Sequence, residues 1–409
     1  MFFTNQRRNR APADFDRKVN LEQSSTCELP SGGGALQDSA RFTFQRTACQ
    51  PQIHRLVTAS SVRPAQILSF NCMIDHSSPM SKRSHMAVIS RRSFLGGAGA
   101  IAAACAARPL FSMAEASKSP FRISVINDEI SQDFDHACYV ASHDFGMSWI
   151  ELRSMWGKNT VALSAAEIGD AQKILAKYNL QVTDIASPLF KTHWPGAPMS
   201  RYGDKQDMHG AAETTFKQQD EVLERSISLA KEFKTGKVRC FDFWRLDDVA
   251  PYRAAIDEKL RSAADTAGQQ DILLVLENEF ECNTATGREA ARTLNAIQTP
   301  HLALNWDPAN AVMRGELDAF PTAWELLPKN RIHHCHCKNA VKGAEGKIEW
   351  SPVDKGFIDW TEQFRALKQC GFRDAVSLET HWTGGGTPEQ CSRISWAGMK
   401  RALKDSGTL

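Results

Sequence analysis

From residue 121 onward, short apolar runs of strand length are followed by longer stretches in which apolar residues recur with the period of a helix. The runs predict eight strands, at residues 121–126, 149–153, 181–186, 237–242, 272–277, 301–307, 331–339 and 375–379. The periodic stretches predict helices at residues 134–145, 164–178, 221–233, 251–267, 360–370 and 389–403, and one that begins near Gly287. Ser164 is a good N-cap for the second of these helices.

Eight strand and helix units in about 290 residues indicate an α/β protein and, more closely, a (β/α)8 barrel. Strands that are apolar throughout are typical of a parallel sheet covered on both faces. A doubly wound open sheet is the alternative. Such a sheet normally carries a glycine-rich fingerprint after its first strand, and Asn127-Asp128-Glu129 does not resemble one.

The first 114 residues differ from the rest. Residues 1–85 show no sustained apolar period, so we expect them to be disordered or to be an upstream extension from a misassigned start. Arg91-Arg92 is then followed by the apolar, small-residue run 96–107 and by Ser112-Met113-Ala114. This order predicts a twin-arginine signal peptide over residues 86–114, export to the periplasm, and a mature barrel domain at residues 115–409.

The apolar run of the signal covers about twelve residues, whereas a helix needs about twenty to span a bilayer. We therefore expect no stable membrane insertion. A second interpretation makes Cys105 a lipid-attachment cysteine, but Ala102 is a poor residue at the leading position of that motif.

The net charge and the cysteine content argue against two classes of protein. The formal net charge of +2 argues against a dedicated nucleic-acid binder, which normally carries a basic stripe. Beyond the signal the cysteines are odd in number, and several lie inside apolar strands, which favours buried small side chains over a disulfide framework.

The strand at residues 331–339 carries two kinds of residue. Because side chains alternate across a strand, His334, His336 and Lys338 share one face, and Cys335 and Cys337 lie on the other. Neighbouring Cys and His therefore point apart, and a zinc knuckle, which uses wider ligand spacings, is excluded. The alternatives for His336 are a single metal ligand at a barrel strand end and a core histidine bonded to backbone.

The active site of a (β/α)8 barrel lies at the C-terminal ends of its strands. Strands five to eight end with Glu277, Asp307, His336 and Glu379. A single carboxylate at a strand end is commonly a helix cap. Glu277 and Glu379, however, finish apolar runs and would be buried charges without a partner, so the four residues together predict a metal site.

The chain resembles the xylose isomerase-like TIM-barrel superfamily of sugar isomerases and epimerases over nearly all of residues 121–405. The segments that carry the resemblance are Leu276-Glu277-Asn278-Glu279, Asn305-Trp306-Asp307-Pro308-Ala309-Asn310, His334-Cys335-His336-Cys337-Lys338-Asn339, Ser377-Leu378-Glu379-Thr380 and Lys355-Gly356-Phe357-Ile358-Asp359-Trp360.

This resemblance implies that Glu277, Asp307, His336 and Glu379 hold one divalent ion. Three carboxylates and one imidazole are hard ligands, so Mn2+, Mg2+ and Co2+ suit the site at least as well as Zn2+. The ion would bind the carbonyl and adjacent hydroxyl of a ketose and make the neighbouring C–H acidic. Glu277 and Glu379 would remove and return the proton through an enediolate.

The resemblance also implies a set of substrate-binding residues. Glu151 and Arg153 end the second strand, where they would bind hydroxyls or pair with each other. Lys338 shares the His336 face and would neutralise an oxyanion. The remaining candidates are Glu279, Asn310, which stands where ketose epimerases often carry a histidine, and the loop pair His193 and Trp194.

Three functions remain open: an isomerase or epimerase of a sugar or related polyol, a periplasmic lyase or hydratase of a 3-keto sugar or glycoside, and a non-catalytic carbohydrate-binding barrel. Thr383-Gly384-Gly385-Gly386-Thr387 lies where barrels commonly hold phosphate, but no cationic residue is near it in sequence. We therefore expect an unphosphorylated substrate. Family resemblance also implies a homo-oligomer, and the insertion at residues 344–355 would cover the site or a neighbouring subunit.

Overall fold

The computed structural model describes residues 119–203 and 214–409. The predicted N-terminal extension and signal peptide lie outside these residues. No helix in the described part of the chain is both long enough and apolar enough to cross a membrane.

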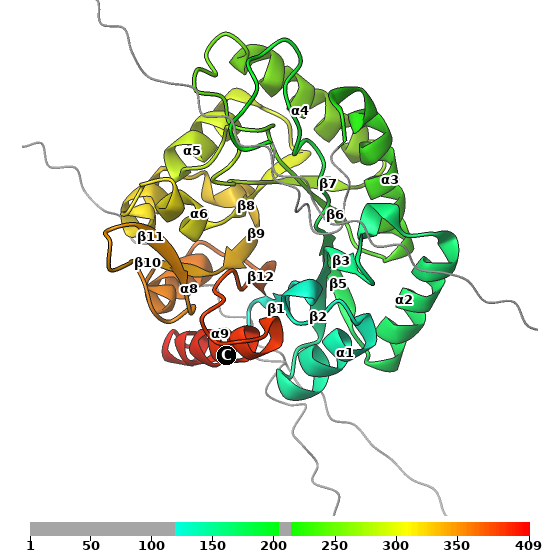
Figure 1. Cartoon of the computed structure of the whole chain (residues 1–409), viewed down its shortest axis with the longest axis vertical. Helices are drawn as coiled ribbons and strands as arrows, with labels where there is room; N and C mark the ends of the chain where they lie inside the picture. Colours follow the sequence, from blue (N-terminus) through cyan, green and yellow to red (C-terminus); the bar gives the residue numbers. More distant parts are fainter. Residues whose placement is uncertain (1–118, 204–213) are drawn as a thin grey trace, which may run out of the picture. The chain divides into compact units, whose positions relative to one another are not determined.

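Eight parallel strands form one sheet that curls into a barrel, with helices around its outside (Figure 1). The order around the sheet is β1-β12-β9-β8-β7-β6-β5-β2. A parallel bridge between Ile126 and Glu151 brings the two edge strands together, so the barrel is nearly closed. The strands are β1 (Arg122–Val125), β2 (Trp149–Leu152), β5 (Gln181–Ile185), β6 (Lys237–Cys240), β7 (Leu273–Glu277), β8 (Leu302–Trp306), β9 (Ile332–Cys337) and β12 (Ala375–Leu378). The predicted (β/α)8 barrel is confirmed.

Helices connect consecutive barrel strands, and a final helix follows the last strand. They are α1 (Phe134–Tyr139), α2 (Ala165–Lys177), α3 (Gln219–Glu232), α4 (Arg253–Gly268), α5 (Gly287–Ala296), α6 (Pro308–Met313), α7 (Trp324–Leu326), α8 (Trp360–Gln369) and α9 (Pro388–Asp405). Ser164 caps α2 through a reciprocal capping box with Glu167, as its position predicts. The apolar period predicted no helix between β8 and β9, where the structure has α6 and α7.

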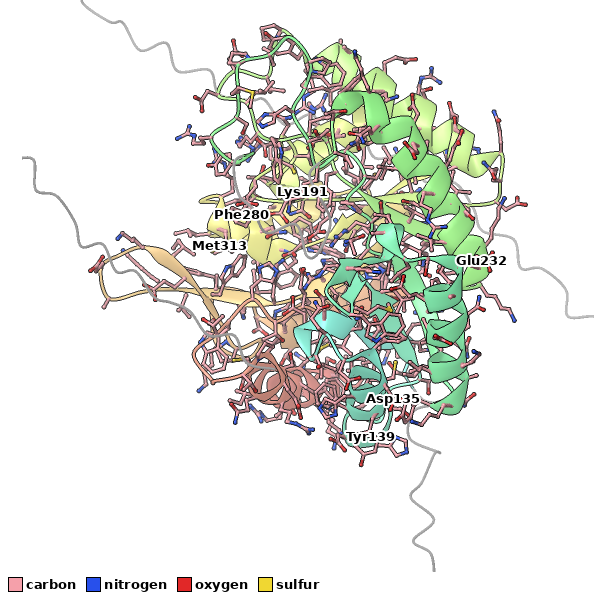
Figure 2. The ribbon with its side chains drawn as sticks, turned by 45° about the vertical axis from the view of Figure 1, so that its right-hand side comes forward. Asp135, Tyr139, Lys191, Glu232, Phe280 and Met313 are labelled. Atoms are coloured by element: carbon pink, nitrogen blue, oxygen red, sulfur yellow. The ribbon has the colours of Figure 1, made fainter. Side chains whose placement is uncertain are left out.

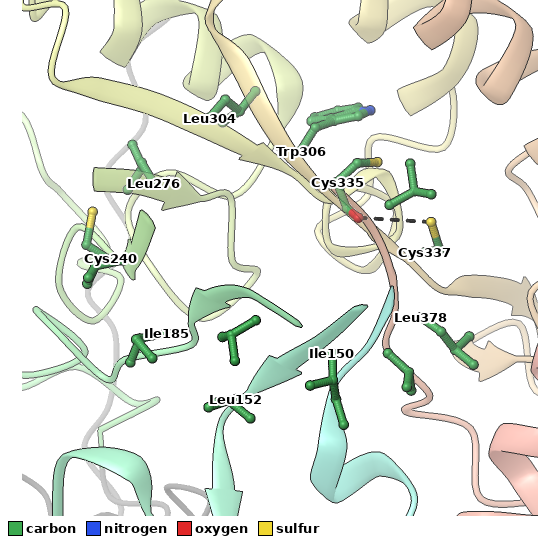
Figure 3. Close-up of a cluster of buried hydrophobic side chains, with 14 of the residues drawn as sticks. Ile150, Leu152, Ile185, Cys240, Leu276, Leu304, Trp306, Cys335, Cys337 and Leu378 are labelled. Atoms are coloured by element: carbon green, nitrogen blue, oxygen red, sulfur yellow. Dashed lines mark hydrogen bonds between the residues drawn. The ribbon is translucent and has the colours of Figure 1, made fainter. Parts of the chain in front are cut away.

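The two faces of the barrel strands bury different side chains. Cys335, Cys337, Leu378 and Trp306 belong to the apolar cluster shown in Figure 3. The cysteines behave as the sequence predicts, because those of the described region are free and all but the exposed Cys370 are buried. Polar side chains from the other strand face hydrogen-bond to one another, as buried polar groups must.

Two short hairpins follow strands of the barrel. One is β3 (Ser154–Met155) with β4 (Lys158–Asn159), and the other is β10 (Asn339–Lys342) with β11 (Ile348–Ser351). The second contains much of the predicted insertion at 344–355 and packs against α6. Asn339 fixes its base, because the Asn339 amide donates to the carbonyl oxygens of Val353 (2.8 Å) and Ile358 (2.9 Å).

Candidate metal centre

Four side chains meet at the C-terminal ends of four neighbouring strands. Glu277 is the last residue of β7, Asp307 follows β8, His336 lies in β9, and Glu379 follows β12. The Nδ1 atom of His336 lies 3.2 Å from Glu277 Oε1, 3.8 Å from Asp307 Oδ2 and 3.0 Å from Glu379 Oε2. One ligand atom from each residue lies within 4.8 Å of the others. The residues expected from the strand ends are thus brought together.

Asp307 uses its two carboxylate oxygens differently. Its Oδ1 accepts the backbone N–H of Asn310 at 2.9 Å and caps helix α6. Its Oδ2 faces the site and lies 2.7 Å from the ammonium nitrogen of Lys338. Burial and the neighbouring Glu379 and Glu277 carboxylates raise the pKa of Asp307 to about 6, against the opposing effect of Lys338. One aspartate therefore both caps a helix and presents an oxygen to the site.

His336 is held by a second buried carboxylate. Its Nε2 lies 3.1 Å from Glu151 Oε1, and the other Glu151 oxygen lies 3.0 Å from His334 Nε2. All three side chains are 0% exposed. A proton on Nε2 that is donated to Glu151 leaves Nδ1 free to coordinate a cation, which is the usual way a carboxylate orients a metal-binding histidine.

Glu277 is bound from both sides of its carboxylate. Its Oε2 lies 3.1 Å from an Arg239 guanidinium nitrogen, and its Oε1 accepts the Asn310 amide at 3.2 Å. Burial alone would raise the pKa of Glu277, but His336 and Arg239 outweigh it and lower the pKa to about 2. Glu277 is therefore ionised at neutral pH.

Glu379 is arranged in a similar way on the other side of His336. Its Oε1 accepts from Arg153 at 2.8 Å, and its Oε2 lies 2.5 Å from Lys338 Nζ. Burial raises the pKa of Glu379, but Lys338 and His336 outweigh burial and hold it well below its ordinary value. Two ionised glutamates thus face each other across His336.

The residues present fit a divalent cation. Hard oxygen ligands with one imidazole are the donor set that Mg2+, Mn2+ and related ions accept. The local charge is also unbalanced. Six carboxyl groups around the site are buried, against three buried Arg and Lys side chains and His336, whose pKa is raised: Glu129, Glu151, Asp184, Glu277, Asp307 and Glu379 against Arg153, Arg239, Lys338 and His336. Buried charge of one sign needs a partner, and a bound cation supplies it.

The predicted substrate contacts fall into two places. Arg153, Asn310 and Lys338 touch the metal-site residues directly, as described above. Arg153 does not pair with Glu151, which was one of the two alternatives, and instead also binds Asp128 at 3.0 Å. A register shift between Ile150 and Leu152 in the pairing of β2 with β5 accompanies this arrangement.

The other predicted contacts lie farther along the loops. Glu279 Oε2 lies 3.6 Å from Lys191 Nζ. His193 Nδ1 accepts the Ser200 backbone N–H at 3.4 Å, and Trp194 packs edge-on against Phe243. Their roles in substrate binding stay predictions.

Several site residues were not found from the sequence. His381 lies 3.1 Å from Glu379 Oε1, and its ring contacts Trp350 of β11 with centroids 4.9 Å apart. His381 follows Glu379 by two, so strand alternation would have pointed to it. Arg239 lies inside a barrel strand, and no sequence pattern marks it as a site residue. Its contact with Glu277 in the structure shows that it orients this carboxylate.

Comparison with known proteins agrees with the barrel fold. The xylose isomerase-like TIM barrel family matches residues 140–401 of the chain. A xylose isomerase-like TIM barrel protein from Mycobacterium smegmatis, in complex with magnesium, is similar at 17% identity with a TM-score of 0.51 over 71% of this chain and 99% of that one.

Two further structures are similar at the level of the fold. The probable 3-DHS dehydratase AsbF, involved in petrobactin synthesis in Bacillus anthracis, has 20% identity and a TM-score of 0.50 over 68% of this chain and 97% of that one. A D-tagatose 3-epimerase-like protein has 14% identity and a TM-score of 0.50 over 70% of this chain and 98% of that one. The family match covers well over half of the chain, so this protein belongs to the xylose isomerase-like TIM barrel family.

Proposed function

We propose that this protein is a metal-dependent isomerase or epimerase of an unphosphorylated sugar or related polyol. The observation that carries the proposal is the pair Glu277 and Glu379. Their carboxylates approach His336 Nδ1 from the β7 side and the β12 side, at 3.2 and 3.0 Å. Two carboxylates on opposite sides of one binding point are what proton removal and return at a carbon centre require.

A divalent cation bound by Glu277, Asp307, His336 and Glu379 would polarise the carbonyl of a sugar and lower the pKa of the adjacent C–H. The protein's own groups carry out the proton transfer. Arg239 binds Glu277 Oε2 and Arg153 binds Glu379 Oε1, which fixes the orientation of both carboxylates and leaves the other oxygen of each beside His336 Nδ1. One glutamate takes the proton from carbon, and a proton returns from the same or the opposite side.

Lys338 would stabilise developing negative charge. Its ammonium lies 2.7 Å from Asp307 Oδ2 and 2.5 Å from Glu379 Oε2, and the side chain is 2% exposed. Burial lowers the pKa of Lys338, but Asp307 and Glu379 outweigh it and raise the pKa above its ordinary value. Lys338 therefore stays a cation and donates hydrogen bonds throughout the cycle.

The test is incorporation of solvent deuterium into sugar carbon. Incubation of the metal-loaded protein with a panel of ketoses in D2O should label the substrate, and Glu379→Gln should abolish labelling. Glu389→Gln on the surface of α9 is the matched control and should label normally. Equal labelling by wild type and Glu379→Gln would refute the assignment of Glu379.

A lyase or hydratase acting on a 3-keto sugar or glycoside is the second candidate, and His381 favours it. Its ring lies beside Glu379 Oε1, and its side chain remains 22% exposed, whereas Glu379 is buried. A base and an imidazole at adjacent positions suit removal of a proton from one carbon and protonation of a group that leaves the next. Release of an aglycone or of water in the same incubations would distinguish this candidate.

We also propose export through the twin-arginine signal at residues 86–114. A reporter fused to this segment should reach the periplasm, and replacement of Arg91 and Arg92 by lysine should retain it in the cytoplasm. Export that is insensitive to both arginines would contradict the proposal.

A further inference from the structure

Three aromatic rings from three separate segments of the chain line one side of the site; we call them the aromatic arc. They are Phe280, after β7; Trp350, in β11; and His381, after β12. The ring centroids of Phe280 and Trp350 are 5.9 Å apart, and those of Trp350 and His381 are 4.9 Å apart, both in edge-on geometry. Figure 2 places the labelled Phe280 and Met313 near the hairpin of β10 and β11.

The arc lies directly beside the reaction centre. The Lys338 ammonium is 5.3 Å from the centroid of the Trp350 ring, within the range of a cation–π contact. That same ammonium bonds Asp307 and Glu379. His381 of the arc contacts Glu379 itself, at 3.1 Å from Oε1, so the arc begins at the carboxylates and continues through Trp350 to Phe280.

The arc differs from the rest of the site in its exposure. Phe280, Trp350 and His381 are each partly exposed, whereas Glu277, Asp307, His336, Lys338 and Glu379 are at most 2% exposed. Partly open aromatic surface at the edge of a buried polar centre provides an apolar contact for the portion of a ligand that extends away from the reacting atoms.

The hairpin of β10 and β11, which carries Trp350 of the arc, is held in place at its base. Asn339 Oδ1 accepts the backbone N–H groups of Ala340 (2.9 Å) and Ile358 (3.1 Å), while its amide N–H groups donate to the carbonyl oxygens of Val353 and Ile358 in the segment after β11. The backbone of Gly356 packs against Asn339 with φ 154°. A Cβ at this position would lie only 2.3 Å from Asn339 Oδ1, so the close approach requires glycine. Trp350 is therefore presented by an anchored hairpin.

We infer that the aromatic arc is a binding subsite for the aglycone of a glycoside, and that an aromatic aglycone suits it best. This inference rests on the second function proposed above, a lyase or hydratase of a glycoside, and deepens it by naming the substrate class of the same site. The two centroid separations together extend beyond one sugar ring, which is more surface than a free ketose bound at the carboxylates requires. Stacking on Trp350 would favour a substrate with a second ring over the same sugar without one.

The test is binding of matched pairs of ligands to the metal-loaded protein. The probes are the phenyl β-glycosides of glucose, galactose and xylose, each compared with its free sugar by isothermal titration calorimetry. We expect at least one phenyl glycoside to bind about tenfold more tightly than its free sugar, a difference that one aromatic stacking contact supplies. Trp350→Ala should remove this preference, and Trp350→Phe should keep most of it.

Trp156→Ala is the matched control, because Trp156 is 36% exposed and packs against Phe134. This variant should keep the preference. If no phenyl glycoside binds more tightly than its free sugar, or if Trp350→Ala keeps the preference, the inference is overturned.

The result is separable from that of the deuterium test. Trp350-dependent binding without deuterium labelling would retain the subsite and refute the isomerase. Labelling of free ketoses without any preference for a glycoside would support the isomerase and refute the subsite.

Discussion

Replacement of Glu151 by glutamine distinguishes two roles for this residue. The sequence left two roles open, a contact with sugar hydroxyls or a pair with Arg153. The structure directs both Glu151 oxygens at histidine rings, 3.1 Å from His336 Nε2 and 3.0 Å from His334 Nε2. Glutamine keeps the shape of the side chain but offers one acceptor and one NH2 donor. One of the two histidine N–H groups would then lose its acceptor.

The magnitude follows from burial. Glu151 is 0% exposed, and burial alone would raise its pKa, but His336 and His334 outweigh burial and hold the pKa well below its ordinary value. Loss of one hydrogen bond to such a charged group costs about 1.5–3 kcal/mol. The loss of an outer carboxylate typically weakens metal binding by about 10- to 100-fold, or about 1.4–2.8 kcal/mol. We expect Glu151→Gln to weaken Mn2+ binding by this factor.

The assay is calorimetric titration of Mn2+ into the metal-free protein. Glu389→Gln is the control, because Glu389 also contacts a histidine, His136, at 2.8 Å, but does so at the surface. Its Mn2+ affinity should equal that of the wild type. Unchanged Mn2+ affinity in Glu151→Gln, with weaker sugar binding at saturating Mn2+, would refute the reasoning and favour the sugar contact.

Three further predictions concern the site, the hairpin and the base of the barrel. Burial lowers the pKa of His336, but Glu151 and Glu277 outweigh burial and raise the pKa well above its ordinary value. Mn2+ binding at pH 7 should therefore release about one proton, and the Mn2+ affinity should rise with pH. Titrations in buffers of different ionisation enthalpy that show no proton release would contradict this. Asn339→Ala removes a buried side chain that makes four hydrogen bonds to the backbone. It should lower the free energy of unfolding, measured in urea, by roughly 3 kcal/mol. A loss below about 1 kcal/mol would show that Asn339 does not anchor the base of the hairpin. Burial raises the pKa of Asp374, but hydrogen bonds from His333 and Lys237 outweigh burial and lower it, so its contribution is present above the unfolded-state pKa of about 3.9 and is lost as pH falls through the folded-state pKa. Asp374→Asn should therefore cost about 1.5–3 kcal/mol at pH 7 and progressively less below about pH 4, and a cost independent of pH would refute this.

The barrel and the four strand-end residues were predictable because both depend on local pattern. The apolar runs fixed the strands, and parallel strands in one barrel must end on the same side, so Glu277, Asp307, His336 and Glu379 had to meet. The alternation along β9 also separated His334 and His336 from Cys335, as the structure confirms.

The surroundings of the site were less predictable because they depend on contacts between distant segments. Glu151 and His336 are 185 residues apart, and nothing in either segment shows that one orients the other. Trp350 lay in what the pattern showed only as an insertion. Its place beside Lys338 follows from the path of the hairpin over α6, which is set by packing.

The measurement that tests the central claim most directly is the metal content of residues 115–409, determined by inductively coupled plasma mass spectrometry beside Asp307→Ala. The four-ligand centre predicts one tightly held divalent ion per wild-type chain and its loss in Asp307→Ala. An equal metal content in the two proteins, or no divalent ion in the wild type even after loading with Mn2+, would contradict the account.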